Sequence, residues 1–220
     1  MGRKFKVIAA LLLVASGLFI GAGLKKEYDK YHASDDKLNP IIRLIEPEGG
    51  TFCTAVVISN DLAVTANHCI NIEQEMMPGV FQVHLLPYME IRAADNIPRG
   101  LSAAPLWWDF RRDIAIIKGD FTKFLPRKYL SKPEDLIKYM KKDIKLVSCG
   151  YPYHGPLFCN QGFFVDRVGF HWGANTVVLP GMSGGPTMLE DGTVVGINDA
   201  VEQTQGGLSI ISPTYDLPVK

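Results

Sequence analysis

The sequence predicts an all-β protein made of two units, residues 41–120 and 144–220. Apolar runs of four to seven residues alternate with turn signals from residue 41 onward, and this pattern is typical of all-β domains. A polar, Lys-rich connector with two prolines, residues 121–143, separates the units. No repeat or low-complexity segment interrupts this pattern, so we expect a two-part β structure.

Turn residues mark two hairpins. Asn60-Asp61 separates two apolar runs in the first unit, and Asp191-Gly192 does the same in the second. Asp-Gly is a strong hairpin signal, because both central residues of that turn type take positive φ. The predicted strands are 55–59 paired with 62–65, 187–190 paired with 193–197, and 114–118.

The composition of the chain gives no sign of nucleic-acid binding and says little about other partners. The chain has 220 residues, of which 47 % are hydrophobic, enough for one substantial core or two small ones. It carries 23 basic and 23 acidic residues, so no basic surplus indicates nucleic-acid binding.

The N-terminal 24 residues resemble a membrane-targeting segment. Residues 7–24 carry no charge and lie between a basic head and Lys25-Lys26. As a helix they extend about 27 Å, close to the hydrocarbon thickness of a bilayer. An uncleaved anchor fits better than a cleaved signal peptide, because residues 14–16 and 21–23 are mediocre cleavage sites. Both interpretations place the rest of the chain, after a polar tether at 25–40, outside the cytoplasm.

Four cysteines agree with an exported protein. An even number suggests two disulfides, and the sequence alone allows three pairings. The spacing contains no C-x-x-C and no paired histidines, so it does not indicate a zinc site. We expect neither a metal nor a cofactor. The cysteines are Cys53, Cys69, Cys149 and Cys159.

Three motifs carry candidate chemistry. In residues 181–186, glycines surround Ser183, which favours an exposed hydroxyl and lets the N–H groups of Gly181 and Ser183 converge on an oxyanion. The same residues match the nucleophile elbow of α/β-hydrolases, but those enzymes need a histidine after the serine, and none follows Ser183. A solvent-facing serine in a Gly-rich turn is the simpler alternative.

The second and third motifs supply a base and an acid. His68 follows an apolar strand, and a Cys53–Cys69 disulfide would hold the strand end, worth about 3 kcal/mol. Asp113 begins a buried strand, where a carboxylate needs a partner such as an imidazole N–H. Asp109 is a rival acid, but no clean strand follows it.

These residues make the chain resemble the chymotrypsin-like (trypsin-fold) serine peptidases. The matching segments are 65–69 (TANHC), 113–117 (DIAII) and 181–186 (GMSGGP), in that family's order, and the resemblance covers residues 45–215. It implies two antiparallel six-stranded β-barrels packed face to face, with a His68, Asp113, Ser183 triad between them. It also implies a Cys53–Cys69 bridge, whereas a Cys149–Cys159 hairpin bridge is not a feature we connect with the family.

The resemblance implies a serine endopeptidase acting on protein or peptide substrates. Met182 replaces the acid that precedes the nucleophile in animal digestive members, so the chain is closer to bacterial, HtrA-like members. Alignment puts four residues at the primary pocket, which suggests cleavage after small or medium uncharged residues, although Asp199 nearby complicates this. The pocket candidates are Val177, Val178, Asn198 and Gly207.

Two other functions compete with catalysis. One is an inactive binding module that keeps the fold, and the other is a membrane-tethered adaptor. The first usually shows a lost triad member, and none is lost here. If the chain is a peptidase, activity should fall as His68 becomes protonated, near or below about pH 6.5 for an unshifted pKa.

Overall fold

The computed structural model describes residues 38–47, 52–139, 141, 143–202 and 208–219. The described residues from Asn39 onward belong to one compact unit. Within the described residues no helix is long and apolar enough to cross a membrane. The predicted anchor or signal segment, residues 7–24, lies outside those residues.

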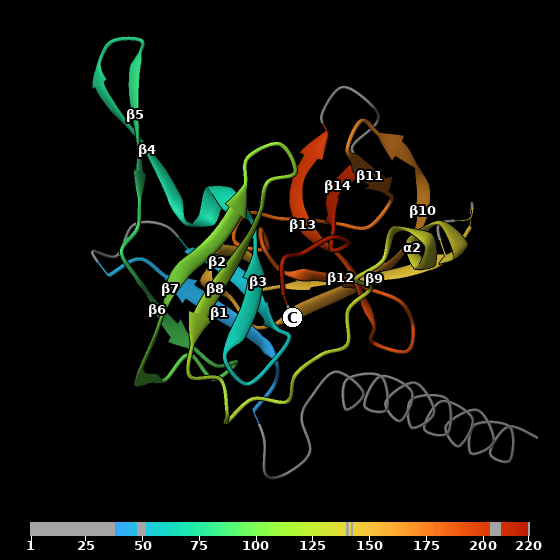
Figure 1. Cartoon of the computed structure of the whole chain (residues 1–220), viewed down its shortest axis with the longest axis horizontal. Coiled ribbons are helices and arrows are strands. Elements are labelled where there is room, and N and C mark those ends of the chain that lie inside the picture. Colours follow the sequence, from blue (N-terminus) through green and yellow to red (C-terminus); the bar gives the residue numbers. More distant parts are fainter. Residues whose placement is uncertain (1–37, 48–51, 140, 142, 203–207, 220) are drawn as a thin grey trace, which may run out of the picture. The chain divides into compact units, whose positions relative to one another are not determined.

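Twelve strands form two closed antiparallel barrels of six strands each (Figure 1). Closure pairs every strand on both sides and leaves no open edge. The first barrel runs β1 (Ile41–Ile45), β2 (Phe52–Val57), β3 (Leu62–Thr65), β8 (Ile114–Gly119), β7 (Pro98–Asp109), β6 (Met89–Arg92). The second runs β10 (Phe158–Val168), β11 (His171–Ala174), β14 (Leu208–Pro213), β13 (Val194–Glu202), β12 (Pro186–Met188), β9 (Lys145–Gly150). The predicted all-β, two-barrel fold is therefore confirmed.

Short apolar runs fill each barrel. In β8 the residues from Ile114 to Ile117 are all fully buried, as expected for a strand that is covered on both faces. In the second barrel, Phe164 and Trp172 pack edge to face with ring centroids 6.2 Å apart. Each core is thus built from the runs that predicted the strands.

The hairpin that follows β12 differs from the expected tight turn. β12 ends at Met188 and β13 begins at Val194, with a register shift between Thr187 and Met188. Gly192 has a φ of +85°, and Asp191 is not among the residues with positive φ. The prediction of two positive-φ central residues was wrong, because the bulged register lengthens the loop beyond two residues.

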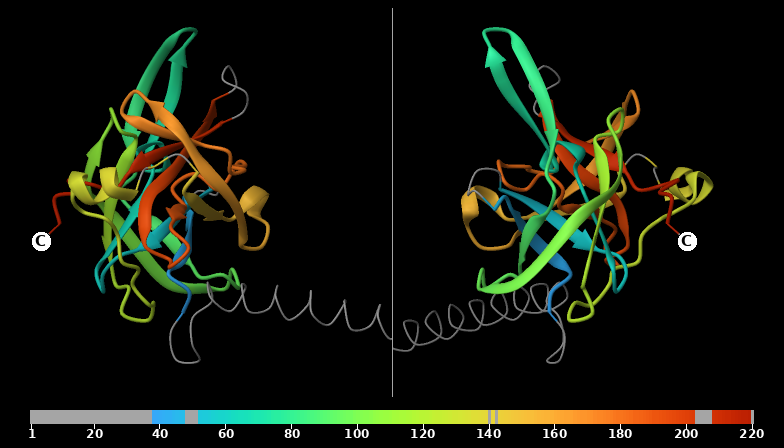
Figure 2. Two further views of the ribbon diagram at one scale, coloured as in Figure 1. Left: turned by 90° about the vertical axis from the view of Figure 1, so that its right-hand side faces the viewer. Right: turned by 60° about the vertical axis from the view of Figure 1, so that its left-hand side comes forward.

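Two features outside the barrels, a projecting hairpin and a short helix, were not predicted from the sequence. β4 (Asn71–Met77) and β5 (Val80–Leu85) pair only with each other and project from the barrels in all views (Figures 1 and 2). The connector contains a short helix, α2 (Pro133–Tyr139).

The connector is bonded to both barrels. The Arg127 N–H donates to the carbonyl of Val57 in the first barrel. Leu130 N–H donates to the carbonyl of Val194 in the second barrel, whose own N–H donates to Lys128. The connector therefore helps to fix the barrels relative to each other, which matters because the candidate residues come from both.

Direct contacts also join the barrels near the candidate site. Thr54 on β2 donates its hydroxyl to the carbonyl of Gly181 at 2.8 Å and accepts the N–H of Tyr151 at 3.1 Å. The buried Tyr151 hydroxyl donates to the carbonyl of Ile41 at 2.7 Å. Arg43 places its guanidinium 4.1 Å from the centre of the Tyr151 ring.

Candidate active site

His68 lies on a 3₁₀ turn, η1 (Asn67–Cys69), which follows β3. The predicted Cys53–Cys69 disulfide is present and joins this turn to β2. The Asn67 N–H donates to the backbone carbonyl of Asp113 at 3.1 Å. The turn is therefore fixed both to its own hairpin and to the start of β8.

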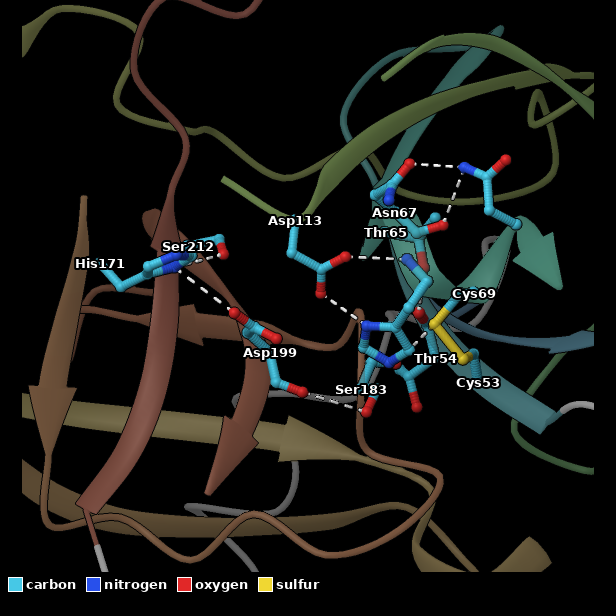
Figure 3. A network of polar contacts seen from close by, with 12 residues as sticks. Cys53, Thr54, Thr65, Asn67, Cys69, Asp113, His171, Ser183, Asp199 and Ser212 are labelled. Atoms are coloured by element: carbon cyan, nitrogen blue, oxygen red, sulfur yellow. Dashed lines mark hydrogen bonds and ion pairs between the residues drawn. A yellow bond between two sulfur atoms is a disulfide. The ribbon is translucent and has the colours of Figure 1, made fainter. Parts of the chain in front are cut away.

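Asp113 binds His68 through both carboxylate oxygens (Figure 3). Its Oδ1 accepts the backbone N–H of His68 at 2.8 Å, and its Oδ2 lies 2.5 Å from the ring Nδ1. A proton on Nδ1 leaves Nε2 of the neutral ring as an acceptor. The Asp113 side chain is 18 % exposed and that of His68 is 46 % exposed, so the ring edge is open to a substrate.

The backbone at Asp113 adopts an uncommon conformation. Its φ is +46°, which costs a non-glycine residue about 1–2 kcal/mol. Asp109, the rival acid, is the last residue of β7, where it accepts the N–H groups of Arg111 and Arg112 and pairs with the Arg112 side chain at 2.8 Å. Asp109 thus closes the turn that presents Asp113.

The pair shifts the pKa of both partners. Burial disfavours the charged form of His68, but the hydrogen bond and negative charge of Asp113 outweigh it and raise the pKa of His68. Burial alone would raise the pKa of Asp113, but the hydrogen bond and charge of His68 lower it overall. The arrangement therefore favours an imidazolium next to a carboxylate, the state that a general base reaches after it takes a proton.

Ser183 lies in a loop that is bonded to both barrels. Its carbonyl accepts the N–H of Thr54 on β2 at 2.8 Å, and Gly184 N–H donates to Asn198 on β13 at 2.7 Å. Gly184 has a φ of +79°, and a Cβ there would lie 2.1 Å from the Thr65 hydroxyl and 2.2 Å from the Thr54 carbonyl. Only glycine fits where the loop passes this closely over the first barrel.

Two N–H groups of this loop are available as donors. Those of Met182, Gly184 and Gly185 are bonded to carbonyls. Among the described residues, the N–H groups of Gly181 and Ser183 have no such partner. These are the two donors that the sequence predicted for an oxyanion.

The Ser183 hydroxyl is not bonded to His68. It donates to the backbone carbonyl of Asp199 at 3.3 Å (Figure 3). The carboxylate of Asp199 belongs to the same cluster, since one carboxylate oxygen each of Asp199 and Asp113 and a ring nitrogen of His68 all lie within 4.8 Å of one another. The three predicted residues therefore meet at one place, with the serine turned toward the Asp199 backbone.

A family model described as "Trypsin-like peptidase domain" matches residues 53–197. The chain belongs to the trypsin-like peptidases. The matched segment includes all three candidate catalytic residues, and no curated protein sequence matches the chain significantly.

Solved structures share the fold of this trypsin-like peptidase at low sequence identity. The serine endoprotease from Yersinia pestis superposes with a TM-score of 0.63 at 17 % identity over 81 % of this chain and 60 % of that one. The HtrA-type protease AlgW, solved with a tripeptide, gives 0.62 at 16 % identity over 81 % and 57 %. The active form of the Rv3671c protease from M. tuberculosis gives 0.58 at 19 % over 79 % and 74 %. The chain thus spans about 60 % of the Yersinia protein, and these similarities establish the fold.

The pocket candidates of this trypsin-like peptidase occupy different environments. Val177 is 49 % exposed, and its backbone is held by the Asn160 side chain, whereas Val178 is only 7 % exposed. Asn198 is fully buried and bonds the Thr187 hydroxyl and the carbonyl of Cys149. Gly207 lies outside the described residues.

Asn198 holds the nucleophile loop. Besides its side-chain bonds, its carbonyl accepts the N–H of Gly184 and its N–H donates to Gly185. The Cys149–Cys159 disulfide joins directly opposed residues of β9 and β10 below it. This hairpin bridge, one of the pairings that the sequence left open, stiffens the strand whose carbonyl Asn198 binds.

Sequence reasoning missed the role of two neighbours of the triad. Asp199 was placed near the pocket wall, but its carboxylate lies beside Asp113. His171, on β11, lies with its Nδ1 3.4 Å from Asp199 Oδ2, although nothing in its sequence context indicated this. β14 pairs with both β11 and β13, and this strand order brings the two residues together.

A separate hollow lies elsewhere on the second barrel. It has a volume of about 340 Å³ and is lined mainly by Phe164, Trp172, Ile137 and Tyr215. None of its lining residues belongs to the triad cluster, so we do not assign it to the reaction.

Proposed function

We propose that this trypsin-like peptidase is an active serine endopeptidase. The observation that carries the proposal is the pair of hydrogen bonds between His68 and Asp113. They lie next to a serine loop in which the N–H groups of Gly181 and Ser183 bind no backbone carbonyl of the described residues. These parts match the base, orienting acid, nucleophile and oxyanion donors that acyl transfer requires.

The reaction follows from these groups. Ser183 Oγ rotates from the Asp199 carbonyl to His68, whose Nε2 takes its proton as Oγ attacks the scissile carbonyl. The N–H groups of Gly181 and Ser183 stabilise the oxyanion, while Asp113 holds the ring and stabilises the imidazolium. His68 then donates the proton to the leaving amine, and water, deprotonated by His68, releases the acyl group from Ser183. No metal or cofactor enters any step.

Hydrolysis of an unfolded protein tests this proposal. The full chain with its disulfides formed is incubated with reduced casein, and fragments are followed by mass spectrometry. We expect internal cleavage that Ser183→Ala and His68→Ala each abolish. Fragments that persist in both variants, or no cleavage by a folded wild-type protein, would contradict it.

We also propose that cleavage follows small or medium uncharged residues. The support is the apolar character of Val177 and Val178, since an unpaired charge in such a pocket loses hydration without compensation. A peptide library with varied residues before the scissile bond tests this. Preference for Lys or Arg at that position would overturn it.

We propose that the catalytic domain acts outside the cytoplasm, with residues 7–24 as its anchor. Two disulfides among the described residues support an oxidising compartment. Membrane fractionation with carbonate washing, followed by N-terminal sequencing, separates an anchored chain from a cleaved and released one. A soluble protein that begins after residue 24 would contradict the anchor.

A second candidate function is an inactive binding module. The specific observation in its favour is that Ser183 donates to the Asp199 carbonyl and not to His68. A binding role survives Ser183→Ala, whereas a peptidase role does not, so this variant separates the two.

A further inference from the structure

A second carboxyl group lies against the catalytic acid. The side chains of Asp199 and Asp113 are 15 % and 18 % exposed, and one carboxylate oxygen of each lies within 4.8 Å of the other and of a ring nitrogen of His68. Two largely buried carboxylates at this separation cannot both be ionised without a large cost. One of them therefore retains a proton near neutral pH.

The surrounding charges decide which carboxyl holds that proton. Asp113 has His68 as its direct partner, so it is the member that ionises. On the far side, Asp199 faces His171, whose Nδ1 is 3.4 Å from Asp199 Oδ2 and 3.2 Å from the Ser212 hydroxyl (Figure 3). His171 is partly buried, and this burial lowers its pKa and keeps the ring neutral, so it offers no positive charge to Asp199.

Few other groups bear on this pair. From the first barrel, Asp113 and His68 face Asp199. From the second barrel, His171 on β11 and Ser212 on β14 do so. Burial opposes the charged form of His171 more strongly than Asp113, the backbone of Arg111 and Asp109 favour it. Burial first, and then Asp113, raise the pKa of Asp199 to about 8.

We propose that Asp199 is a positioning residue for the peptidase reaction, whose protonated carboxyl donates a hydrogen bond to Asp113 and holds it toward His68. The inference rests on the proposed serine peptidase activity. Asp113 needs such support because its backbone has a φ of +46° and its two oxygens must meet the ring and the backbone of His68 together. Ionisation of Asp199 removes the donor and puts a second negative charge next to Asp113.

This arrangement predicts a loss of activity at alkaline pH that depends on Asp199. An asparagine at 199 offers a similar donor at every pH, whereas alanine offers none. In the wild-type chain, kcat should decline as pH rises through about 8. At pH 7 the Asp199→Asn variant should retain most of the kcat that Asp199→Ala loses. Its kcat should show no alkaline decline.

The experiment measures kcat and KM for a peptide substrate from pH 6 to 9.5 on the full chain. We expect Asp199→Ala to lower kcat about tenfold or more at pH 7 with little change in KM, because it acts through Asp113. Asp135→Asn, on the exposed face of α2, is the matched control and should keep the wild-type profile. Equal kcat in Asp199→Asn and Asp199→Ala, with the alkaline decline retained in both, would overturn the proposal.

A second readout does not depend on turnover. In a Ser183→Ala background, the downfield proton resonance of the His68 Nδ1–H bonded to Asp113 is followed by NMR from pH 6 to 9.5. It should shift with a midpoint near pH 8 when Asp199 is present and stay constant over that step in Asp199→Asn. If the resonance shifts in the same way with and without Asp199, the positioning role is overturned, even for a chain that cleaves no substrate. If the shift depends on Asp199 in a chain that cleaves no substrate, only the catalytic proposal is refuted.

Discussion

Asp113 accepts two hydrogen bonds from His68, one from its backbone N–H at 2.8 Å and one at its ring Nδ1, 2.5 Å away. The backbone bond fixes the carboxylate to the turn that carries the ring, and the ring bond fixes the tautomer. The orientation of the base is therefore set by the fold before any substrate arrives, which is the condition for efficient proton transfer.

The first prediction concerns the acid side of the pH profile. His68 acts as a base only when neutral, and Asp113 raises its pKa above the ordinary value of 6.5. Wild-type kcat/KM should therefore fall with decreasing pH about a midpoint higher than 6.5. Steady-state kinetics in constant ionic strength buffers measure this. A midpoint at or below 6.5 would show that the ion pair is not formed in the free enzyme.

The second prediction removes the acid. Asp113→Asn leaves the side-chain shape but favours the wrong His68 tautomer, and kcat should fall by about 10⁴. The acid midpoint of the residual activity should move to lower pH, because the charge that raised the pKa of His68 is gone. Asp109→Asn is the matched control, since Asp109 closes the neighbouring turn without touching His68. A similar loss in both variants would indicate disruption of the turn.

The third prediction tests the loop that carries Ser183. Gly184→Ala combines positive φ, worth about 1–2 kcal/mol, with a Cβ 2.1 Å from the Thr65 hydroxyl, and overpacking adds about 1–3 kcal/mol. Gly79→Ala is its control, because Gly79 has the same φ of +79° but nothing within 4 Å of its added Cβ. Urea unfolding should show a larger loss for Gly184→Ala. Equal losses would mean that the loop does not pack on the first barrel as described.

The fourth prediction concerns stability and the sign of its pH dependence. The pKa of Asp199 is raised from 3.8 to about 8, so the folded chain binds this proton more tightly than the unfolded chain. The resulting stability is complete below pH 3.8 and is lost as pH rises to about 8. The side chain of Asp199→Asn does not titrate, so the Tm of this variant relative to wild type should rise from pH 4 to 8 and then level off. Each kcal/mol of lost wild-type stability should change this Tm difference by about 2–4 °C. A difference in Tm that is constant with pH would contradict the shift.

Much of the fold followed from local sequence patterns. The apolar runs at 55–59, 62–65 and 114–118 correspond to β2, β3 and β8. Short β-branched runs bounded by turn residues form strands at any position in the chain, so local sequence is enough to predict them. The β4–β5 hairpin was not predicted, and the helix α2 was hidden by flanking prolines and lysines. Both lie outside the barrels, where no repeating apolar pattern marks an element.

Only the site residues that lie in recognisable sequence motifs could be predicted. His68, Asp113 and Ser183 each lie in a distinctive local context, so they were found one by one. Asp199 and His171 meet across β13 and β11, which are joined through β14. Their relation depends on the pairing of β14 with both strands and on a register shift after Asn198, neither of which a linear pattern encodes.

Covalent labelling of Ser183 tests the central claim most directly. The full chain, with disulfides formed, is treated with a fluorophosphonate probe, and the modified residue is located by mass spectrometry with Ser183→Ala as control. The account predicts a label on Ser183 alone, because only a serine with an assembled base and oxyanion hole reacts readily. A folded wild-type chain that takes no label, or takes it equally in Ser183→Ala, would contradict it.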